Sequence, residues 1–176
     1  MATPFLRPLR RLGPATVRGV LIGTALLLAA ATLSACADEP VTLDSPALSS
    51  SDEQTCNTFL DDLPRTLADH ERRKVNPASA LGRAWGDPAI IVRCGVGVPD
   101  GFGAASLCEV ANGVGWYVDP AVISDQGMDA TLTAVGYRPL VSVTVPADYR
   151  PEGAAAAIAE LAQPVKDHLT LVQKCQ

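Results

Sequence analysis

Five charged and aromatic side chains could together hold a ligand. Trp85 and Asp87 precede an apolar segment that contains Arg93, and Glu109 and Trp116 flank a turn further along the chain. An indole ring stacks on a sugar ring or an apolar group, while nearby charges supply hydrogen bonds that fix the orientation of a ligand. We therefore take these five residues as candidate binding residues for a sugar or a peptide.

The same residues also allow a purely structural interpretation. Trp85 can belong to the hydrophobic core, and Asp87 can form an Asx turn before Pro88. Arg93 and Glu109 can form a cross-strand ion pair, which is an ordinary way to stabilise a sheet. The sequence leaves both interpretations open.

Signatures of catalysis and of cofactor binding are not found in the sequence. There is no Gly-x-Ser-x-Gly motif, and no glycine-rich loop joins a predicted strand to a predicted helix. His168 lies beside an apolar stripe and is interpreted as structural, and His70 is expected to be solvated at a charged helix end. We therefore predict no catalytic residue, no metal site and no cofactor.

The chain has five cysteines, of which Cys36 stands apart near the amino terminus. The other four, an even number, indicate disulfides if the domain is exported, and no C-x-x-C motif favours a metal or redox site. Three pairings are possible. The strand register described next favours Cys94 with Cys108, which leaves Cys56 with Cys175.

Five apolar segments of strand-like pattern occupy the middle of the chain: 90–96, 107–111, 114–118, 131–135 and 140–145. Asn112-Gly113 predicts a two-residue hairpin turn, and residues 136–139 suggest a second turn.

In an antiparallel hairpin the numbers of the two residues in each pair add up to the same value, and this value defines the register. Pairing Cys94 with Cys108 places Val92 opposite Val110, and the Asn-Gly turn places Glu109 opposite Trp116. The predicted core face of these strands consists of Ile90, Val92, Cys94, Cys108, Val110 and Tyr117. In the last hairpin Leu132, Ala134, Val141 and Val143 share one face.

Amphipathic segments precede and follow the strands. Helical spacing begins near Ser51, extends to Leu67 and ends at the basic cluster 72–74, and a second apolar stripe follows Pro151. Pro64 and Pro164 predict a kink or a break in these helices. The order of elements predicts an α+β fold, an antiparallel sheet of about five strands with the N- and C-terminal helices packed on one face.

The first residues are typical of a secretory signal. Four arginines and no acidic residue precede an apolar run over residues 20–32, and small residues follow this run up to Cys36. The run is shorter than the roughly 20 residues that a transmembrane helix needs.

The segment Leu33-Ser34-Ala35-Cys36 resembles the lipobox of bacterial lipoproteins. The resemblance implies cleavage before Cys36 and attachment of lipid to its thiol. We therefore expect residues 1–35 to be a signal peptide, and the Cys36 lipid to hold the protein on the outer face of the cytoplasmic membrane.

The residues after the signal are acidic. Of 14 Lys and Arg residues four precede Cys36, whereas all 19 acidic residues follow it, so the remainder has 10 basic and 19 acidic residues and a net charge of −9. This charge argues against a nucleic-acid partner and against a domain lying flat on anionic lipid. Residues 36–50 have little apolar periodicity and predict a flexible tether, and residues 51–176 predict a single domain.

Several short segments resemble a family of exported actinobacterial proteins that is known only as a domain of unknown function. The most specific are Trp85-Gly86-Asp87-Pro88 and Arg93-Cys94-Gly95-Val96, together with Gly113-Val114-Gly115-Trp116. The resemblance implies an exported envelope protein and supplies no activity. We expect a non-enzymatic binding domain whose partner is a wall fragment or an envelope protein, and the alternative is an accessory factor or enzyme of wall metabolism.

Overall fold

The computed structural model describes residues 39–175, to which all structural statements below refer. Residues 39–175 belong to one compact unit. The predicted signal peptide, residues 1–35, and the predicted lipidation site Cys36 lie outside the described residues.

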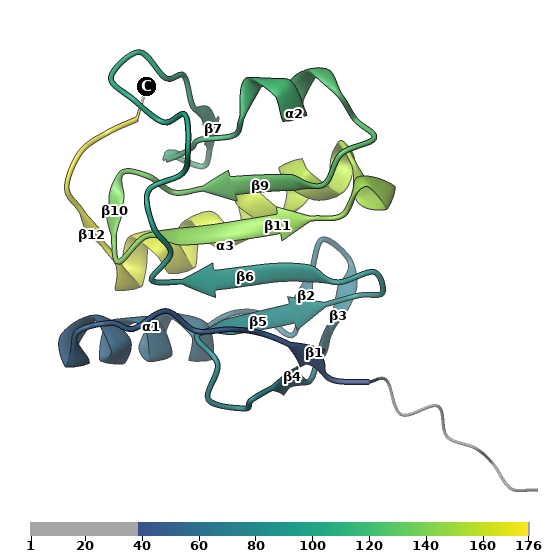
Figure 1. The fold of residues 1–176 in the computed structure, drawn as a ribbon, viewed down its shortest axis with the longest axis vertical. Coiled ribbons are helices and arrows are strands. Elements are labelled where there is room, and N and C mark those ends of the chain that lie inside the picture. Colours follow the sequence, from purple (N-terminus) through teal and green to yellow (C-terminus); the bar gives the residue numbers. More distant parts are fainter. Residues whose placement is uncertain (1–38, 176) are drawn as a thin grey trace, which may run out of the picture. The chain divides into compact units, whose positions relative to one another are not determined.

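The domain is a mixed α/β fold around a six-stranded sheet in which all pairs are antiparallel (Figure 1). The sheet has the order β2-β3-β5-β6-β11-β9. Its strands are β2 (Thr66–Leu67), β3 (His70–Arg73), β5 (Gly82–Trp85), β6 (Ile90–Cys94), β9 (Ala130–Thr133) and β11 (Val141–Val145). The predicted α+β class is therefore confirmed, with six strands in place of about five.

Helices and short strand pairs surround this sheet. The helices are α1 (Ser50–Asp61), α2 (Pro120–Ser124), η1 (Ala147–Tyr149) and α3 (Glu152–His168). The short pairs are β1 (Val41–Thr42) with β4 (Val75–Asn76), β7 (Glu109–Ala111) with β8 (Val114–Trp116), and β10 (Tyr137–Arg138) with β12 (Thr170–Leu171).

The core lies between the sheet and the helices α1 and α3. On β6, Ile90, Val92 and Cys94 are fully buried and alternate with partly exposed residues, as the period of two requires. The β9–β11 register pairs Leu132 with Val143, and both are buried, as predicted. Helix α3 contacts β11 and α1, and its apolar stripe includes the buried Ile158, Leu161 and Val165.

The prediction that β6 pairs with the segment containing Cys108 was wrong. A strand has two edges, and those of β6 are occupied by β5 and β11, so β7 forms a separate hairpin with β8. Val110, which was predicted to be in the core, is 63% exposed. The predicted Asn112-Gly113 turn and the Glu109–Trp116 register are confirmed.

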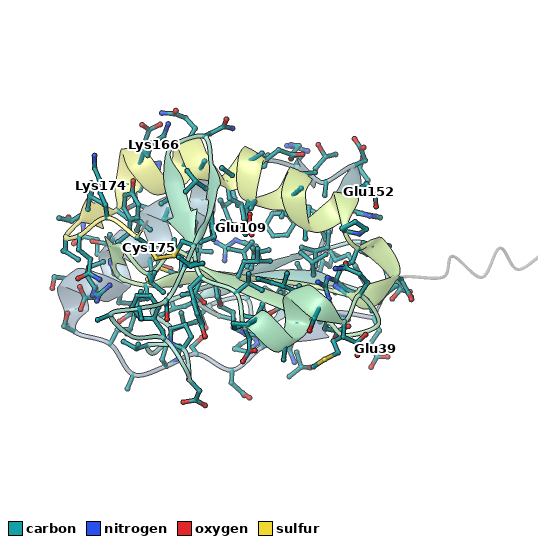
Figure 2. All side chains as sticks on the ribbon, turned by 90° about the horizontal axis from the view of Figure 1, so that it is seen from above. Glu39, Glu109, Glu152, Lys166, Lys174 and Cys175 are labelled. Carbon is teal, nitrogen blue, oxygen red and sulfur yellow. A yellow bond between two sulfur atoms is a disulfide. The ribbon has the colours of Figure 1, made fainter. Side chains whose placement is uncertain are left out.

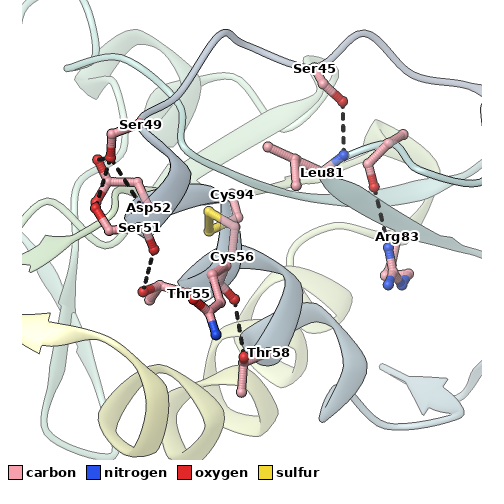
Figure 3. Close-up of a disulfide and its surroundings, with 12 residues drawn as sticks. Ser45, Ser49, Ser51, Asp52, Thr55, Cys56, Thr58, Leu81, Arg83 and Cys94 are labelled. Atoms are coloured by element: carbon pink, nitrogen blue, oxygen red, sulfur yellow. Dashed lines mark hydrogen bonds between the residues drawn. A yellow bond between two sulfur atoms is a disulfide. The ribbon is translucent and has the colours of Figure 1, made fainter.

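The favoured disulfide pairing was wrong for the same reason. The structure joins Cys56 of α1 to Cys94 of β6, and Cys108 to Cys175. Both sulfur-bearing residues of the first bond are fully buried, and the bond fastens α1 to the centre of the sheet (Figure 3).

The first helix is shorter than the apolar spacing predicted. It begins after Ser49, whose hydroxyl accepts a hydrogen bond from the Asp52 amide, and it ends at Asp61, shortly before Pro64. The residue before a proline is disfavoured in helices, so the chain leaves the helix here. The basic cluster 72–74 therefore lies on and after strand β3, not at a helix end. Helix α3, in contrast, runs through Pro164 to His168.

The described part of the predicted tether is ordered against the domain. β1 pairs in parallel with β4, and Leu43 is only 2% exposed. The Ser45 hydroxyl accepts a hydrogen bond from the Leu81 amide at 2.8 Å (Figure 3). Leu43 and Leu48 lie over Gly82 and Gly95, where an added Cβ would come within 3 Å of their side chains. Residues 39–49 therefore form a strap on the sheet.

Candidate functional site

The two tryptophans predicted to bind a ligand are fully buried. The Trp85 indole N–H donates to the Pro64 carbonyl at 3.2 Å, and the Arg72 guanidinium lies 5.3 Å from the centre of the Trp85 ring. Trp116 packs in the core beneath α3, and its indole N–H has no hydrogen-bond partner among the described residues. Neither ring presents a face to a ligand in this structure.

The three predicted charged residues lie apart. Asp87 is 82% exposed and pairs with Arg73 at 3.1 Å. Arg93 lies in register with Gly82 and Ser142 in the sheet, whereas Glu109 belongs to the separate β7–β8 hairpin. The structure thus places only Glu109 and Trp116 opposite one another, and the cross-strand pair of Arg93 with Glu109 is not formed.

A different group of residues meets where the β2–β3 hairpin approaches the beginning of α3. The His70 ring stacks on Tyr149, with 4.0 Å between the ring centroids and 32° between the ring planes. The imidazole also lies against the backbone of Gly86, where an added Cβ would come within 3.0 Å of it. Tyr149 and Gly86 therefore fix the orientation of the His70 ring.

The turn that carries His70 has an unusual backbone. Ala68 and Asp69 have φ values of 48° and 66°, which are both in the left-handed region. This region disfavours an alanine by about 1–2 kcal/mol, so surrounding contacts must hold the turn. The Glu160 carboxylate of α3 accepts hydrogen bonds from the Ala68 amide at 3.3 and 3.4 Å. Non-glycine residues in this conformation cluster at functional sites.

The resulting pocket is an open hollow of about 310 Å³, near the lower end of the usual range for ligand sites. It is lined by Ala68, Asp69, His70, Tyr149, Glu152, Gly153 and Ala156. Its charged lining consists of the carboxylates of Asp69 and Glu152, and Glu152 lies at one end of the domain (Figure 2). Such a pocket offers hydrogen-bond acceptors to a cationic group.

The two histidines differ in what their rings contact. His168 Nε2 lies 2.9 Å from a carboxylate oxygen of Asp62, in agreement with the predicted structural role. Within residues 39–175 the His70 ring nitrogens have no hydrogen bond to protein, so they can serve a ligand. The prediction that His70 lies solvated at a helix end was wrong, since it lies on strand β3 and is half-buried.

A model of the family described as "Protein of unknown function (DUF3515)" matches residues 16–173. The chain belongs to this family. This match confirms the predicted resemblance to a domain of unknown function. No curated protein and no solved structure matches the chain.

This DUF3515 domain also has a basic hollow of about 410 Å³ on the same hairpin, lined by Arg65, Glu71, Arg72, Arg73 and Lys74. Burial lowers the pKa of Arg72, and the nearby cations Arg83 and Arg65 lower it further, whereas Asp61 opposes them. The Arg72 guanidinium donates to the Leu63 carbonyl at 2.6 Å, and its buried Nε has no partner among the described residues. The four cations in the lining of this hollow therefore outnumber its one carboxylate, Glu71.

An apolar groove of about 210 Å³ runs between α2, β9 and α3 of the DUF3515 domain. Its lining includes Ile123, Leu132 and Ile158, with Glu109 as the carboxylate in its wall. Ile123 in this lining is 48% exposed. The groove is thus a second surface that could receive a side chain from a partner.

Among residues 39–175, no helix is long and apolar enough to cross a bilayer, and no group of three or more metal-ligating side chains occurs. The sequence could not have indicated the His70 pocket, because His70, Tyr149 and Glu152 are brought together only by the packing of the β2–β3 hairpin against α3.

Proposed function

We propose that this protein is an exported actinobacterial lipoprotein that is anchored through Cys36 to the outer face of the cytoplasmic membrane. The order of arginines, apolar run, small residues and cysteine supports export and lipidation. More than one acyl chain is needed for stable anchoring, and bacterial lipoproteins of this pattern carry their acyl chains at the cysteine. The net charge of −9 after the signal argues against nucleic acid as a partner.

We propose further that the domain binds a wall fragment that carries a free amine in the His70 pocket. One observation carries this proposal: the His70 imidazole is packed against Tyr149 and Gly86, beside two carboxylates, and its nitrogens have no hydrogen bond to any of residues 39–175. An ammonium group donates hydrogen bonds to carboxylates and to a neutral imidazole, and charged acceptors strengthen such bonds. Wall peptides present such amines at the membrane surface where the lipid anchor would hold the domain.

Nuclear magnetic resonance of the histidines tests this binding site. The chain has two histidines, so a histidine-labelled protein from residue 36 onward, made as Cys36→Ser to remove the lipid, gives one reporter in the pocket and one outside it. Titration with a muropeptide bearing a free amine is expected to shift the His70 signals saturably and to leave His168 unchanged.

Two controls make the result specific. The same muropeptide with its amine acetylated is expected to leave both histidines unshifted, because it has lost its charge. The double variant Asp69→Asn/Glu152→Gln keeps the shape of the side chains and is expected to weaken binding at least tenfold, since it removes both carboxylates. If His70 does not respond to the free amine, the binding proposal is wrong.

The alternative binding proposal is an envelope protein held in the apolar groove. The exposed Ile123 in the apolar lining of that groove favours it, because apolar residues gathered on a surface commonly mark an interface. A photo-crosslinking residue at position 123 in cells, with one at the exposed position 163 on α3 as the control, tests this alternative. A specific adduct from position 123 alone would favour the protein partner.

Enzymatic activity in wall metabolism is the remaining alternative. It is tested in the same titration, because a substrate that is turned over gives new product signals with time. A stable bound spectrum supports a binding protein.

A further inference from the structure

Four of the ten basic residues after Cys36 lie within residues 65–74. Arg65, Arg72, Arg73 and Lys74 line the basic hollow together with one carboxylate, Glu71. Thr66 pairs with Glu71 in the β2–β3 hairpin, which brings Arg65 beside Arg72, and the Arg72 amide donates to the Arg65 carbonyl. The hollow is therefore a local positive region on a domain that is otherwise acidic.

The strap enters the domain beside this hollow. The Arg73 guanidinium donates to the Glu39 carbonyl at 2.8 Å, and the Val41 amide donates to the Lys74 carbonyl at 2.9 Å. Leu43 continues the ladder by donating to the carbonyl of Asn76. The first described residues are thus fixed to the two residues, Arg73 and Lys74, that form one wall of the hollow.

Covalent geometry limits how far the proposed lipid anchor can lie from this point. Cys36 precedes Glu39 by three residues, and three extended residues span at most about 10 Å. This reach is about one Debye length at 0.1 M salt, so charges beside Glu39 interact with the head groups of the membrane that holds the lipid.

We propose that Arg65 and Lys74, beside the point where the strap enters, dock this end of the domain on the anionic head groups of the membrane. The proposal rests on the proposed lipidation of Cys36 and adds an orientation to it. Contact is made through one end, which agrees with the expectation that so acidic a domain does not lie flat on anionic lipid. Figure 2 shows Glu39 at the end of the domain opposite to Lys166 and Lys174.

Two of the four cations in the hollow already have partners in the protein, which leaves Arg65 and Lys74 to contact lipid. Arg73 is engaged with Gly86, Asp87 and Glu39, and Arg72 with Leu63 and the Trp85 ring. Arg65 and Lys74 are exposed, and no side-chain hydrogen bond or ion pair of either occurs among residues 39–175. A phosphate in the hollow would also relieve the repulsion among the cations around Arg72.

Lysine footprinting of the lipidated full-length mature protein tests the docking. The chain contains three lysines: Lys74 in the hollow, and Lys166 and Lys174 at the opposite end. The protein is placed in phosphatidylcholine vesicles with or without about 30% phosphatidylglycerol, an anionic lipid. Acetylation of each lysine by a water-soluble reagent is then followed by mass spectrometry.

We expect Lys74 to react severalfold more slowly on the anionic vesicles, while Lys166 and Lys174 react equally on both kinds of vesicle. The difference should vanish in about 1 M salt, where the Debye length falls to about 3 Å. The variant Arg65→Gln should weaken the docking about fivefold, the factor that corresponds to one cation at an anionic surface, and so remove most of the protection of Lys74. Lys166→Gln removes an equal charge at the far end and should change nothing.

Equal labelling of Lys74 on both kinds of vesicle would overturn the docking proposal, as would equal protection of all three lysines. The peptide that contains Cys36 reports on the proposed function separately. If its mass shows no lipid, the lipoprotein proposal and the docking both fail, whereas a lipidated Cys36 with an unprotected Lys74 refutes the docking alone.

Discussion

The two disulfides lie in regions of the domain that are held together differently. Cys56–Cys94 joins α1 to the centre of the sheet, where both residues are fully buried within one continuous core. Cys108–Cys175 joins a loop to the end of the chain, where both residues are partly exposed, beside a small cluster of Tyr117, Val135 and Leu140.

Loop length and burial rank these two bonds in opposite orders. The sequence separations are 38 and 67 residues, so the loop-entropy model assigns the slightly larger stabilisation to Cys108–Cys175. Burial instead favours Cys56–Cys94, because its removal also disturbs close packing. The disulfide in the sheet region thus acts on the core, whereas the other restrains segments outside the six-stranded sheet, here called the C-terminal layer (β7, β8, β10, β12 and residues 172–175).

The largest effect is expected from Cys56→Ala/Cys94→Ala. The loop term is about 4 kcal/mol, and lost packing of two fully buried residues adds to it. Since small domains have a free energy of unfolding of about 5–15 kcal/mol, this variant should be close to unfolded at 37 °C. Urea denaturation followed by circular dichroism measures the loss.

A smaller loss, of about 2 kcal/mol, is expected from Cys108→Ala/Cys175→Ala. The freed tail gains conformational entropy in the native state, which offsets part of the loop term. Hydrogen exchange should rise in β12 and β8 and remain unchanged in β6. A loss equal to or larger than that of the first variant would show that loop length, not burial, decides the ranking.

Prediction from sequence succeeded where local pattern and packing agree. The alternation in β6 and the Asn112-Gly113 turn were predicted, because a period of two and a left-handed turn leave direct traces in residue type. The class of the fold followed from the order of these elements. These local patterns predict the positions of most strands in the sheet region and of the β7–β8 hairpin.

Prediction failed where the outcome depends on competition between distant segments. The β2–β3 turn consists of Ala68 and Asp69, which carry no hairpin signal, so the apolar residues around it fitted a helix. Nothing in the residues near Cys94 indicated that β5 and β11 would occupy both edges of β6. The His70 pocket depends on both of these outcomes, which explains why the sequence pointed to two core tryptophans instead.

The two tryptophans allow the same comparison with single substitutions. Trp85→Phe is expected to lower the free energy of unfolding by about 1–2 kcal/mol more than Trp116→Phe. Trp85→Phe removes the hydrogen bond to the Pro64 carbonyl and the contact with Arg72 in the sheet region. Trp116→Phe, in the C-terminal layer, removes a buried N–H that has no partner among the described residues, so it loses packing alone. Chemical denaturation should show the larger loss for Trp85→Phe, and equal losses would contradict this assignment.

The smallest effects are expected at the two hairpin turns, which have the same backbone type but different residues. Gly113 of the β7–β8 turn has φ of 84° and open space where a Cβ would lie, so Gly113→Asp should destabilise by about 1 kcal/mol through backbone strain alone. Asp69 occupies the equivalent position of the β2–β3 turn, and Asp69→Gly should stabilise by about 0.5 kcal/mol. Thermal unfolding of both variants measures the two changes in stability.

If Gly113→Asp destabilises the domain and Asp69→Gly stabilises it, the β2–β3 turn is strained and is held by Glu160 and by the packing of His70. If both variants lose stability, Asp69 makes a stabilising contact of its own.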